Sequence, residues 1–168
     1  NSQSLTRKEP LTQVNDFNQT EEVLSELEKK NKRMIAAFAP SVRVSIGEMF
    51  GAKVGQNLEK KIVTALKLLG FDDVFDIDYG ADLTIVEEAE EFAQFMQKKW
   101  TTDDEKVRKS TFFTSCCPAW VKFVQKAFPQ FKDSISTCKS PQEITSTIAK
   151  TYYAKIEGVV TEEDIKEV

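Results

Sequence analysis

Two adjacent cysteines, Cys116 and Cys117, are the residues of this chain best suited to chemistry. The apolar segment 111–114 before them predicts a strand, and Pro118 after them favours a helix start, because proline has no N–H to leave unpaired there. Free backbone N–H groups and the helix dipole at such a junction favour thiolate over thiol. A thiolate binds iron or zinc, or attacks a disulfide. The residues alone leave a second interpretation open, in which small buried cysteines fill a tight turn.

Two glutamates, Glu88 and Glu91, form the second candidate site. The spacing predicts a helix over residues 81–100 with an apolar stripe at Ile85, Phe92, Phe95 and Met96. Glu88 falls inside that stripe, and Glu91 lies one turn on at its flank. Desolvation disfavours a charged carboxylate, so we expect Glu88 to hold and pass a proton. In the alternative, the helix is rotated and its glutamates only solvate one side.

A third thiol, Cys138, precedes the capping-box pattern that begins at Ser140. Three thiols are fewer than the four ligands that structural iron–sulfur and zinc sites usually have, so this chain cannot complete such a site alone. The chain contains no histidine. That absence excludes histidine-dependent triads, histidine-ligated zinc and the commonest general base.

The bulk composition describes an ordinary globular domain. The chain has 168 residues, 40% of them hydrophobic, and a net charge of −4. Because the chain has no long basic run, we do not expect nucleic acid as a partner. No apolar stretch of the sequence is long enough for a membrane span. Three cysteines, two of them adjacent, do not form a disulfide framework, so we expect a reducing, cytoplasmic location.

Helical and extended patterns alternate along the chain after a polar segment, residues 1–19, which we expect to be a disordered tail or linker. Strands are predicted at 34–39, 74–77 and 111–114, and helices between and after them. This order predicts an α/β fold with a parallel sheet of about three to four strands and helices on both faces. Ligands of such folds gather at the carboxyl ends of strands. Pro40-Ser41 and residues 115–117 lie at such ends.

The segment Thr114-Ser115-Cys116-Cys117-Pro118-Ala119-Trp120 resembles the first signature of the iron-only (di-iron) hydrogenases. Four further segments resemble that family in the same order, and together the similarity covers residues 33–158. These segments are 39–48, 80–88, 136–142 and 150–153.

The resemblance implies an H-cluster cofactor, which joins a four-iron cubane to a di-iron unit carrying CO, cyanide and a bridging dithiolate. It implies reversible reduction of protons to dihydrogen, with Cys117 as one cubane ligand and Cys116 as the thiol that exchanges a proton with the di-iron unit. It further implies a proton relay and a cofactor pocket; the relay residues are Glu88, Ser136 and Glu91, and the pocket residues are Pro40, Ser41 and Gln142. Cys138 has no ligand role by this matching.

Two later signatures of the family, which supply the other three cubane cysteines, are absent from this chain. The resemblance therefore implies that residues 20–168 are the N-terminal lobe of a two-lobed catalytic domain, truncated before those signatures and inactive alone. The implied partners are the missing C-terminal lobe, or a complementary subunit, and a ferredoxin-like electron carrier. Because the face toward the other lobe would be apolar, we also expect self-association.

Two other functions remain open. The first is a non-catalytic hydrogenase-like sensor, assembly or interaction module; the joint presence of Cys116, Cys117, Glu88, Ser136 and Glu91 argues against it, because a decayed site is expected to lose some of them. The second is a thiol redox protein that uses Cys116 and Cys117. Adjacent cysteines form strained disulfides, which disfavours that function.

Overall fold

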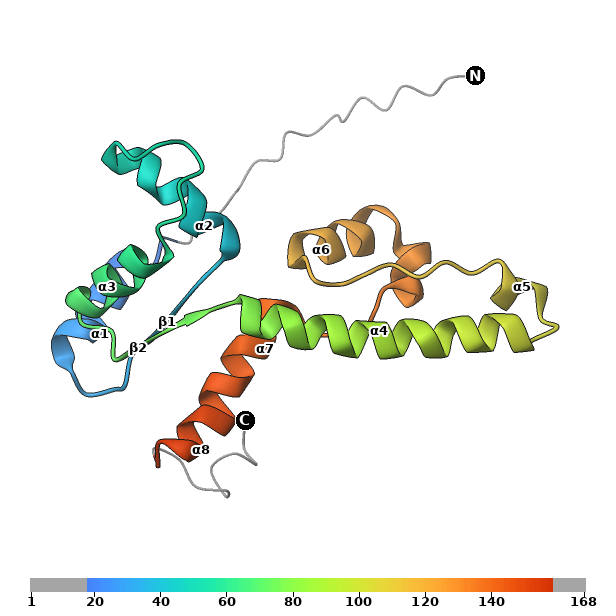
Figure 1. The fold of residues 1–168 in the computed structure, drawn as a ribbon. Helices are drawn as coiled ribbons and strands as arrows, with labels where there is room; N and C mark the ends of the chain where they lie inside the picture. Colours follow the sequence, from blue (N-terminus) through green and yellow to red (C-terminus); the bar gives the residue numbers. More distant parts are fainter. Residues whose placement is uncertain (1–17, 159–168) are drawn as a thin grey trace.

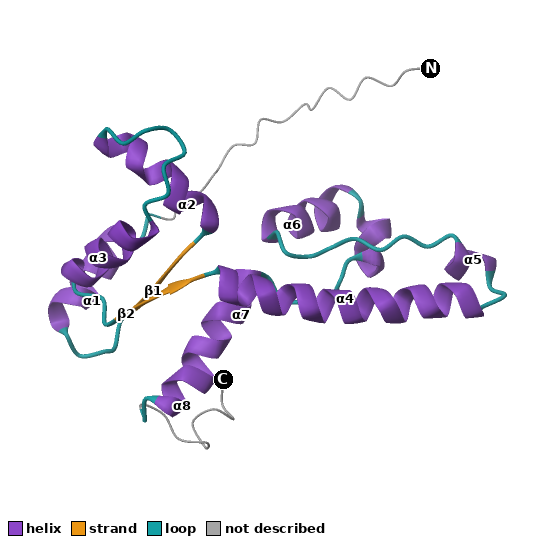
Figure 2. Cartoon of the chain, viewed as in Figure 1, coloured by secondary structure: helices purple, strands orange, loops and turns teal. Residues whose placement is uncertain are grey.

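A computed structural model describes residues 18–158 of the chain. Most of the predicted tail therefore lies outside the described residues. Helices dominate the structure, and two short strands complete it (Figures 1 and 2). The elements in chain order are α1 (Thr20–Lys29), β1 (Ile35–Phe38), α2 (Pro40–Ser45), the 3₁₀ helix η1 (Ile46–Phe50), α3 (Glu59–Leu69), β2 (Asp73–Asp76), α4 (Asp78–Thr101), α5 (Glu105–Arg108), α6 (Pro118–Ala127), the 3₁₀ helix η2 (Pro129–Ser134), α7 (Pro141–Ile148), the π-helical turn η3 (Ala149–Tyr153) and α8 (Ala154–Ile156).

The two strands form a parallel pair in which Ile35 lies opposite Asp73 and Phe38 lies opposite Asp76. Figure 1 shows the pair between α3 on one side and the α7–α8 segment on the other. The ring of Tyr153 packs edge-on against Phe75 of β2, with 4.9 Å between ring centroids. The predicted fold class, α/β with a parallel sheet, is thus confirmed.

The predicted strand count of three to four is wrong for the described residues, which contain two strands. Segment 111–114 is extended, but only Phe113 pairs, through an isolated parallel bridge to Ile135. Its two hydrogen bonds run from Phe113 N to Ser134 O and from Ser136 N to Phe113 O, at 2.8 and 2.7 Å. An apolar run favours extended backbone, but a strand also needs a neighbouring ladder, and the sequence of one segment does not specify that neighbour.

Helix α4 begins at Asp78, three residues before the predicted start at residue 81, so Tyr79 and Gly80 lie in its first turn. Gly80 is the point where α7 crosses α4. A Cβ added at Gly80 would collide with the carbonyl oxygen of Pro141 and with the hydroxyl of Thr145. Thr84 and Thr145 are buried beside it and donate to carbonyls one turn back, Gly80 O and Pro141 O. Small and internally bonded side chains therefore let the two helices approach closely.

The predicted apolar stripe of α4 is only partly buried. Ile85 is 65% exposed and Phe92 is 47% exposed, whereas Glu88 and Glu91 are half-buried. Phe92 and Phe95 contact the ring of Phe112. The expectation that Ile85 faces a core is wrong, because no described segment covers that side of α4.

The apolar core of the described residues is thin. Five buried apolar side chains make up this core: Leu27, Phe38, Ile62, Val124 and Ala149. None of the large side chains of residues 18–158 is less than 2% exposed. Met49, Val54 and Leu68, by contrast, are almost fully exposed. Exposed apolar surface of this extent marks interaction sites. Within the described range, no helix has the length and apolar character needed to cross a membrane.

Replacing Gly80 with alanine tests the α4–α7 contact. Gly→Ala inside an exposed helix ordinarily stabilises by about 1 kcal/mol, whereas overpacking costs about 1–3 kcal/mol. We expect Gly80→Ala to be destabilising, because the added methyl group would meet the backbone of Pro141. Thermal unfolding followed by circular dichroism measures it. Ser146→Ala, at an exposed position of α7, is the control; equal midpoints for the two variants would contradict the close contact.

Candidate functional site

Cys116 and Cys117 lie at the amino end of α6, as the sequence predicts. Cys117 is the residue before the helix, in extended conformation with φ −106° and ψ 106°, and Pro118 is the first helical residue. Both thiols are free and exposed, which disagrees with the interpretation that they fill a buried turn. The loop before them is anchored by the ring of Phe113, which contacts Trp120 of α6 and Phe131 of η2.

Ser115, the residue before the cysteine pair, connects it to Glu88 of α4. The Ser115 N–H and hydroxyl both contact Glu88 Oε1, at 2.7 and 3.1 Å. The Ser115 hydroxyl also donates to the carbonyl oxygen of Cys138, at 2.6 Å. Ser115 is only 6% exposed. Analysis of the sequence missed it as a site residue, since a serine in a loop shows no periodicity; its place directly before the cysteines was the available signal.

Glu91 is bound by the segment around Ser136. Its carboxylate accepts hydrogen bonds from Ser136 Oγ at 2.5 Å, from Thr137 N at 3.0 Å and from Thr137 Oγ1 at 3.1 Å. Burial raises the pKa of the Glu91 carboxyl, but these donors outweigh burial and hold the pKa below its ordinary value. Glu91 is therefore ionised at neutral pH. Thr137, a second residue missed by sequence analysis, contributes two of the three donors.

The backbone of Cys138 connects the two carboxylates. Its N–H donates to Ser136 Oγ at 3.1 Å, and its carbonyl accepts from Ser115. A continuous set of contacts thus runs from Glu88 through Ser115, Cys138 and Ser136 to Glu91, and we call these five residues the Glu88–Glu91 network. Three relay residues predicted from separate segments, Glu88, Ser136 and Glu91, are brought together by it.

The thiol of Cys138 is half-buried beside acidic groups. Burial raises its pKa, and the nearby carboxylates of Glu88, Glu87 and Glu91 raise it further. The thiol lies 3.5 Å from the carbonyl oxygen of Lys139. Cys138 is therefore a neutral thiol in this structure.

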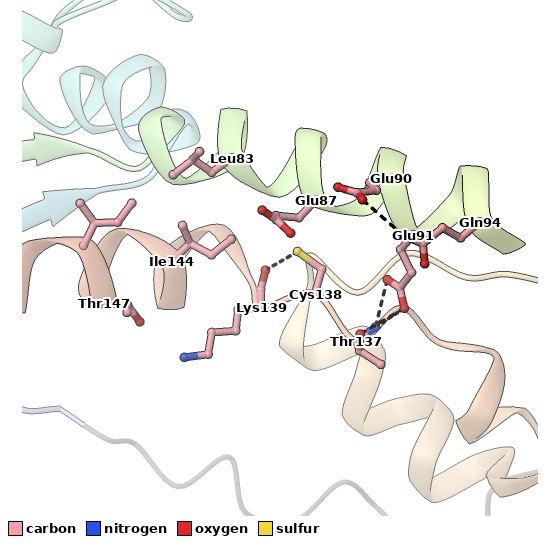
Figure 3. A pocket seen from close by; sticks show the side chains of 11 residues that line it. Leu83, Glu87, Glu90, Glu91, Gln94, Thr137, Cys138, Lys139, Ile144 and Thr147 are labelled. Atoms are coloured by element: carbon pink, nitrogen blue, oxygen red, sulfur yellow. Dashed lines mark hydrogen bonds between the residues drawn. The ribbon is translucent and has the colours of Figure 1, made fainter. Parts of the chain in front are cut away.

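An open groove of about 580 Å³ borders the network (Figure 3). Figure 3 shows Glu87, Glu90 and Glu91 of α4 on one side, with Thr137 and Cys138 opposite them. Lys139 and Ile144 extend the lining toward α7. The groove gives the Glu91 end of the network an acidic, solvent-accessible exit.

Pro40, Ser41 and Gln142 lie at helix starts. Pro40 opens α2 directly after β1, and Gln142 is in the first turn of α7; all three are exposed. Arg43 connects α2 to the start of α4 through ion pairs with Asp76 and Asp78. No hydrogen bond within residues 18–158 joins Pro40, Ser41 or Gln142 to the Glu88–Glu91 network.

The donors available for a metal are incomplete. In the described part of the chain, no group of three or more cysteine, histidine, aspartate or glutamate residues could hold a metal ion. Exposed Cys117 fits a single ligand position at a helix start, with free N–H groups beside it. An iron–sulfur cluster held by four thiolates would require ligands from outside these residues.

The helix-rich α/β fold of this chain is similar to the fold of solved hydrogenase structures. The sequence profile of the family described as "Iron only hydrogenase large subunit, C-terminal domain" matches residues 32–168. The chain belongs to the iron-only hydrogenase family, which confirms the resemblance found in its sequence.

Individual relatives agree with this assignment. The chain is 41% identical over 150 residues to iron hydrogenase 1 of Clostridium pasteurianum, covering 89% of this chain and 25% of that protein. It is 45% identical over 141 residues to the NADP-reducing hydrogenase subunit HndD of Solidesulfovibrio fructosivorans, covering 84% and 24%. The structure of the apo FeFe hydrogenase of Chlamydomonas reinhardtii superposes with a TM-score of 0.74 at 35% identity, over 84% of this chain and 35% of that one. The chain thus spans about a quarter of the length of these two curated relatives.

Replacing Glu91 with glutamine tests the acceptor role of its carboxylate. The folded-state pKa lies below the ordinary value of 4.5, so Glu91 stabilises the fold above pH 4.5, and this contribution is lost as pH falls through the lower folded pKa. We expect Glu91→Gln to lower the free energy of unfolding by about 1–2 kcal/mol at pH 7, with the difference shrinking below about pH 4.5. Urea unfolding at several pH values measures it. Glu90→Gln, one residue earlier and exposed, is the control, and a deficit of Glu91→Gln that does not depend on pH would contradict the role.

Thiol alkylation of the native chain distinguishes the three cysteines. Iodoacetamide reacts with exposed thiolates, so Cys116 and Cys117 should be modified first. Cys138 should react at least about tenfold more slowly, because it is half-buried and its pKa is raised. Peptide mass spectrometry at timed intervals measures the rates, with the urea-unfolded chain as the reference. Equal rates at Cys138 and Cys116 before unfolding would show that the network does not enclose Cys138.

Proposed function

We propose that this chain is the N-terminal lobe of the catalytic domain of an iron-only hydrogenase, whose parent enzyme reversibly reduces protons to dihydrogen. Family membership supports the class of reaction. The observation that carries the assignment of residues is the pair of contacts from Ser115 to Glu88. Glu88 is a half-buried carboxyl group, and Ser115 directly precedes the exposed Cys116 in the sequence.

In this proposal Cys117 is one thiolate ligand of the H-cluster, and the remaining cubane ligands come from polypeptide outside this chain. The H-cluster supplies the metal centre at which protons and electrons combine. Cys116 exchanges a proton with Glu88, and Ser136 and Glu91 continue the path to the acidic groove. Ser136 Oγ is bonded to Glu91 and to the Cys138 N–H, so a proton crosses from Glu88 to Ser136 through a water molecule or a rotation of the hydroxyl.

The proposed partners follow from the exposed surfaces. Pro40, Ser41 and Gln142 are exposed at helix starts, where they are free to line a pocket completed by a C-terminal lobe or complementary subunit. A ferredoxin-like protein is the proposed electron carrier. Exposed Met49, Val54 and Leu68 favour self-association of the chain alone. Three free thiols favour a reducing compartment, the cytoplasm.

A second candidate is a non-catalytic role in iron–sulfur assembly. The chain is 27% identical over 131 residues to the cytosolic Fe-S cluster assembly factor narfl of Danio rerio, covering 77% of this chain and 31% of that protein. The higher identity to the enzymes, 41% and 45%, favours the hydrogenase.

A chimera tests the proposed function. Residues 32–158 of this chain replace the matching segment of iron hydrogenase 1 of Clostridium pasteurianum, and the purified protein is loaded with the cofactor. We expect hydrogen evolution from reduced methyl viologen, measured by gas chromatography, because this segment supplies the missing ligand and relay. Cys116→Ala should lower the rate by about 10²-fold or more, as removal of an acid–base group does.

Glu105→Gln is the control of this assay, since Glu105 is an exposed glutamate of α5 that lines neither the groove nor the network. It should retain the rate of the unmodified chimera. A chimera that holds the cluster and produces no hydrogen would contradict the catalytic function and favour the assembly role. Equal rates for Cys116→Ala and Glu105→Gln would contradict the role of Cys116.

A further inference from the structure

The hydroxyl of Ser115 faces two acceptors with a single proton. Cys138 O lies 2.6 Å from Ser115 Oγ, and Glu88 Oε1 lies 3.1 Å from it. A carbonyl oxygen can only accept, and the shorter contact is the stronger, so the hydroxyl proton points to Cys138 O. The Ser115 hydroxyl therefore binds segment 136–138, and its oxygen remains beside Glu88.

The backbone of Ser115 holds Glu88 from the other side. The Ser115 N–H donates to Glu88 Oε1 at 2.7 Å, the shorter of the two contacts to this carboxyl group. Both polar groups of one buried residue thus converge on a single carboxylate oxygen. The N–H of Ser115 therefore fixes Glu88, while the hydroxyl, with its one proton on Cys138 O, links this contact to segment 136–138.

We propose that Ser115 is a positioning residue for proton transfer between Cys116 and Glu88. The N–H of Ser115 holds Glu88 Oε1 beside the cysteine pair, and the hydroxyl of Ser115 binds Cys138 O and so keeps Ser136 and Glu91 in register with Glu88. This inference rests on the proposed function of Cys116 and Glu88. Ser115 itself carries no proton along the path, because the Cys138 carbonyl that its hydroxyl contacts cannot pass one on.

Removal of the hydroxyl has two separable consequences. Ser115→Ala leaves the N–H contact to Glu88 intact, so the loop still has one link to α4. The variant leaves Cys138 O without its donor, so segment 136–138 loses its link to the Ser115–Glu88 contact. Segment 136–138 and Glu88 then move independently, which lengthens the path of the proton.

Ser110 offers a matched control. Its hydroxyl donates to a backbone carbonyl, Val107 O, at 2.6 Å, the same distance as the contact from Ser115 Oγ to Cys138 O. Ser110 and its hydrogen bond to Val107 are half-buried, and the Ser110 hydroxyl has no carboxylate partner among residues 18–158. Ser110→Ala therefore removes an equivalent serine-to-carbonyl hydrogen bond without touching the network.

The first measurement uses the loaded chimera. We expect Ser115→Ala to lower kcat for hydrogen evolution about tenfold, with KM for methyl viologen unchanged, because the loss concerns one aligned proton transfer. The solvent deuterium isotope effect should rise, and the pH profile of kcat should narrow. Ser115→Thr, which retains the hydroxyl, should recover most of kcat. Rates are taken per loaded cluster, so a loss of folded protein alone does not change them.

The second measurement needs no cofactor. In the full 168-residue chain, Ser115→Ala should increase the rate of Cys138 alkylation several-fold, because segment 136–138 loses its link to the loop. Ser110→Ala should leave that rate unchanged.

The inference is overturned if Ser115→Ala matches Ser110→Ala in kcat, isotope effect and Cys138 alkylation while the unmodified chimera evolves hydrogen. An inactive unmodified chimera instead overturns the proposed function, and the positioning role with it.

Discussion

The local structure of the site depends on two carboxylates of α4, which hold two loops that have almost no backbone ladder of their own. Loops 113–115 and 135–138 share one isolated bridge. Glu88 binds the first loop through Ser115, and Glu91 binds the second through Ser136 and Thr137. Because the ionised carboxylate of Glu91 forms stronger hydrogen bonds than a neutral acceptor does, its contacts replace strand pairing for the second loop. The groups that hold the loops in place are also the groups proposed to pass protons.

The close crossing of α7 over α4 determines where the rest of the site lies. Gly80 and two buried threonines permit that approach, and the capping box of Ser140 and Glu143 starts α7 there. Segment 136–138 runs directly into this helix start, so the end of the relay near Glu91 is fixed by the same contact. The cysteine end is fixed separately, by the aromatic contacts of Phe113 with Trp120 and Phe131. Glu88 and Ser115 connect these two parts.

The apolar surfaces of the chain agree with its relation to the hydrogenases. Ile85 and Phe92 of α4 remain exposed, and the chain spans about a quarter of the length of iron hydrogenase 1 and of the HndD subunit. A four-thiolate cluster likewise needs ligands that these residues do not supply. The exposed apolar surface and the missing cluster ligands both support the proposal that further polypeptide completes the site.

The sequence alone determined the features that depend on near neighbours: the helix starts at Pro118 and Ser140, and the cysteine signature that identifies the family. Tertiary structure decided the features that depend on distant partners. It left the expected third strand as one bridge, because pairing needs a ladder from elsewhere in the chain. It left Ile85 exposed, since burial depends on what covers a face. It also gave Ser115 and Thr137 their roles, because a hydroxyl acquires a function only from the group that the fold places within hydrogen-bonding distance.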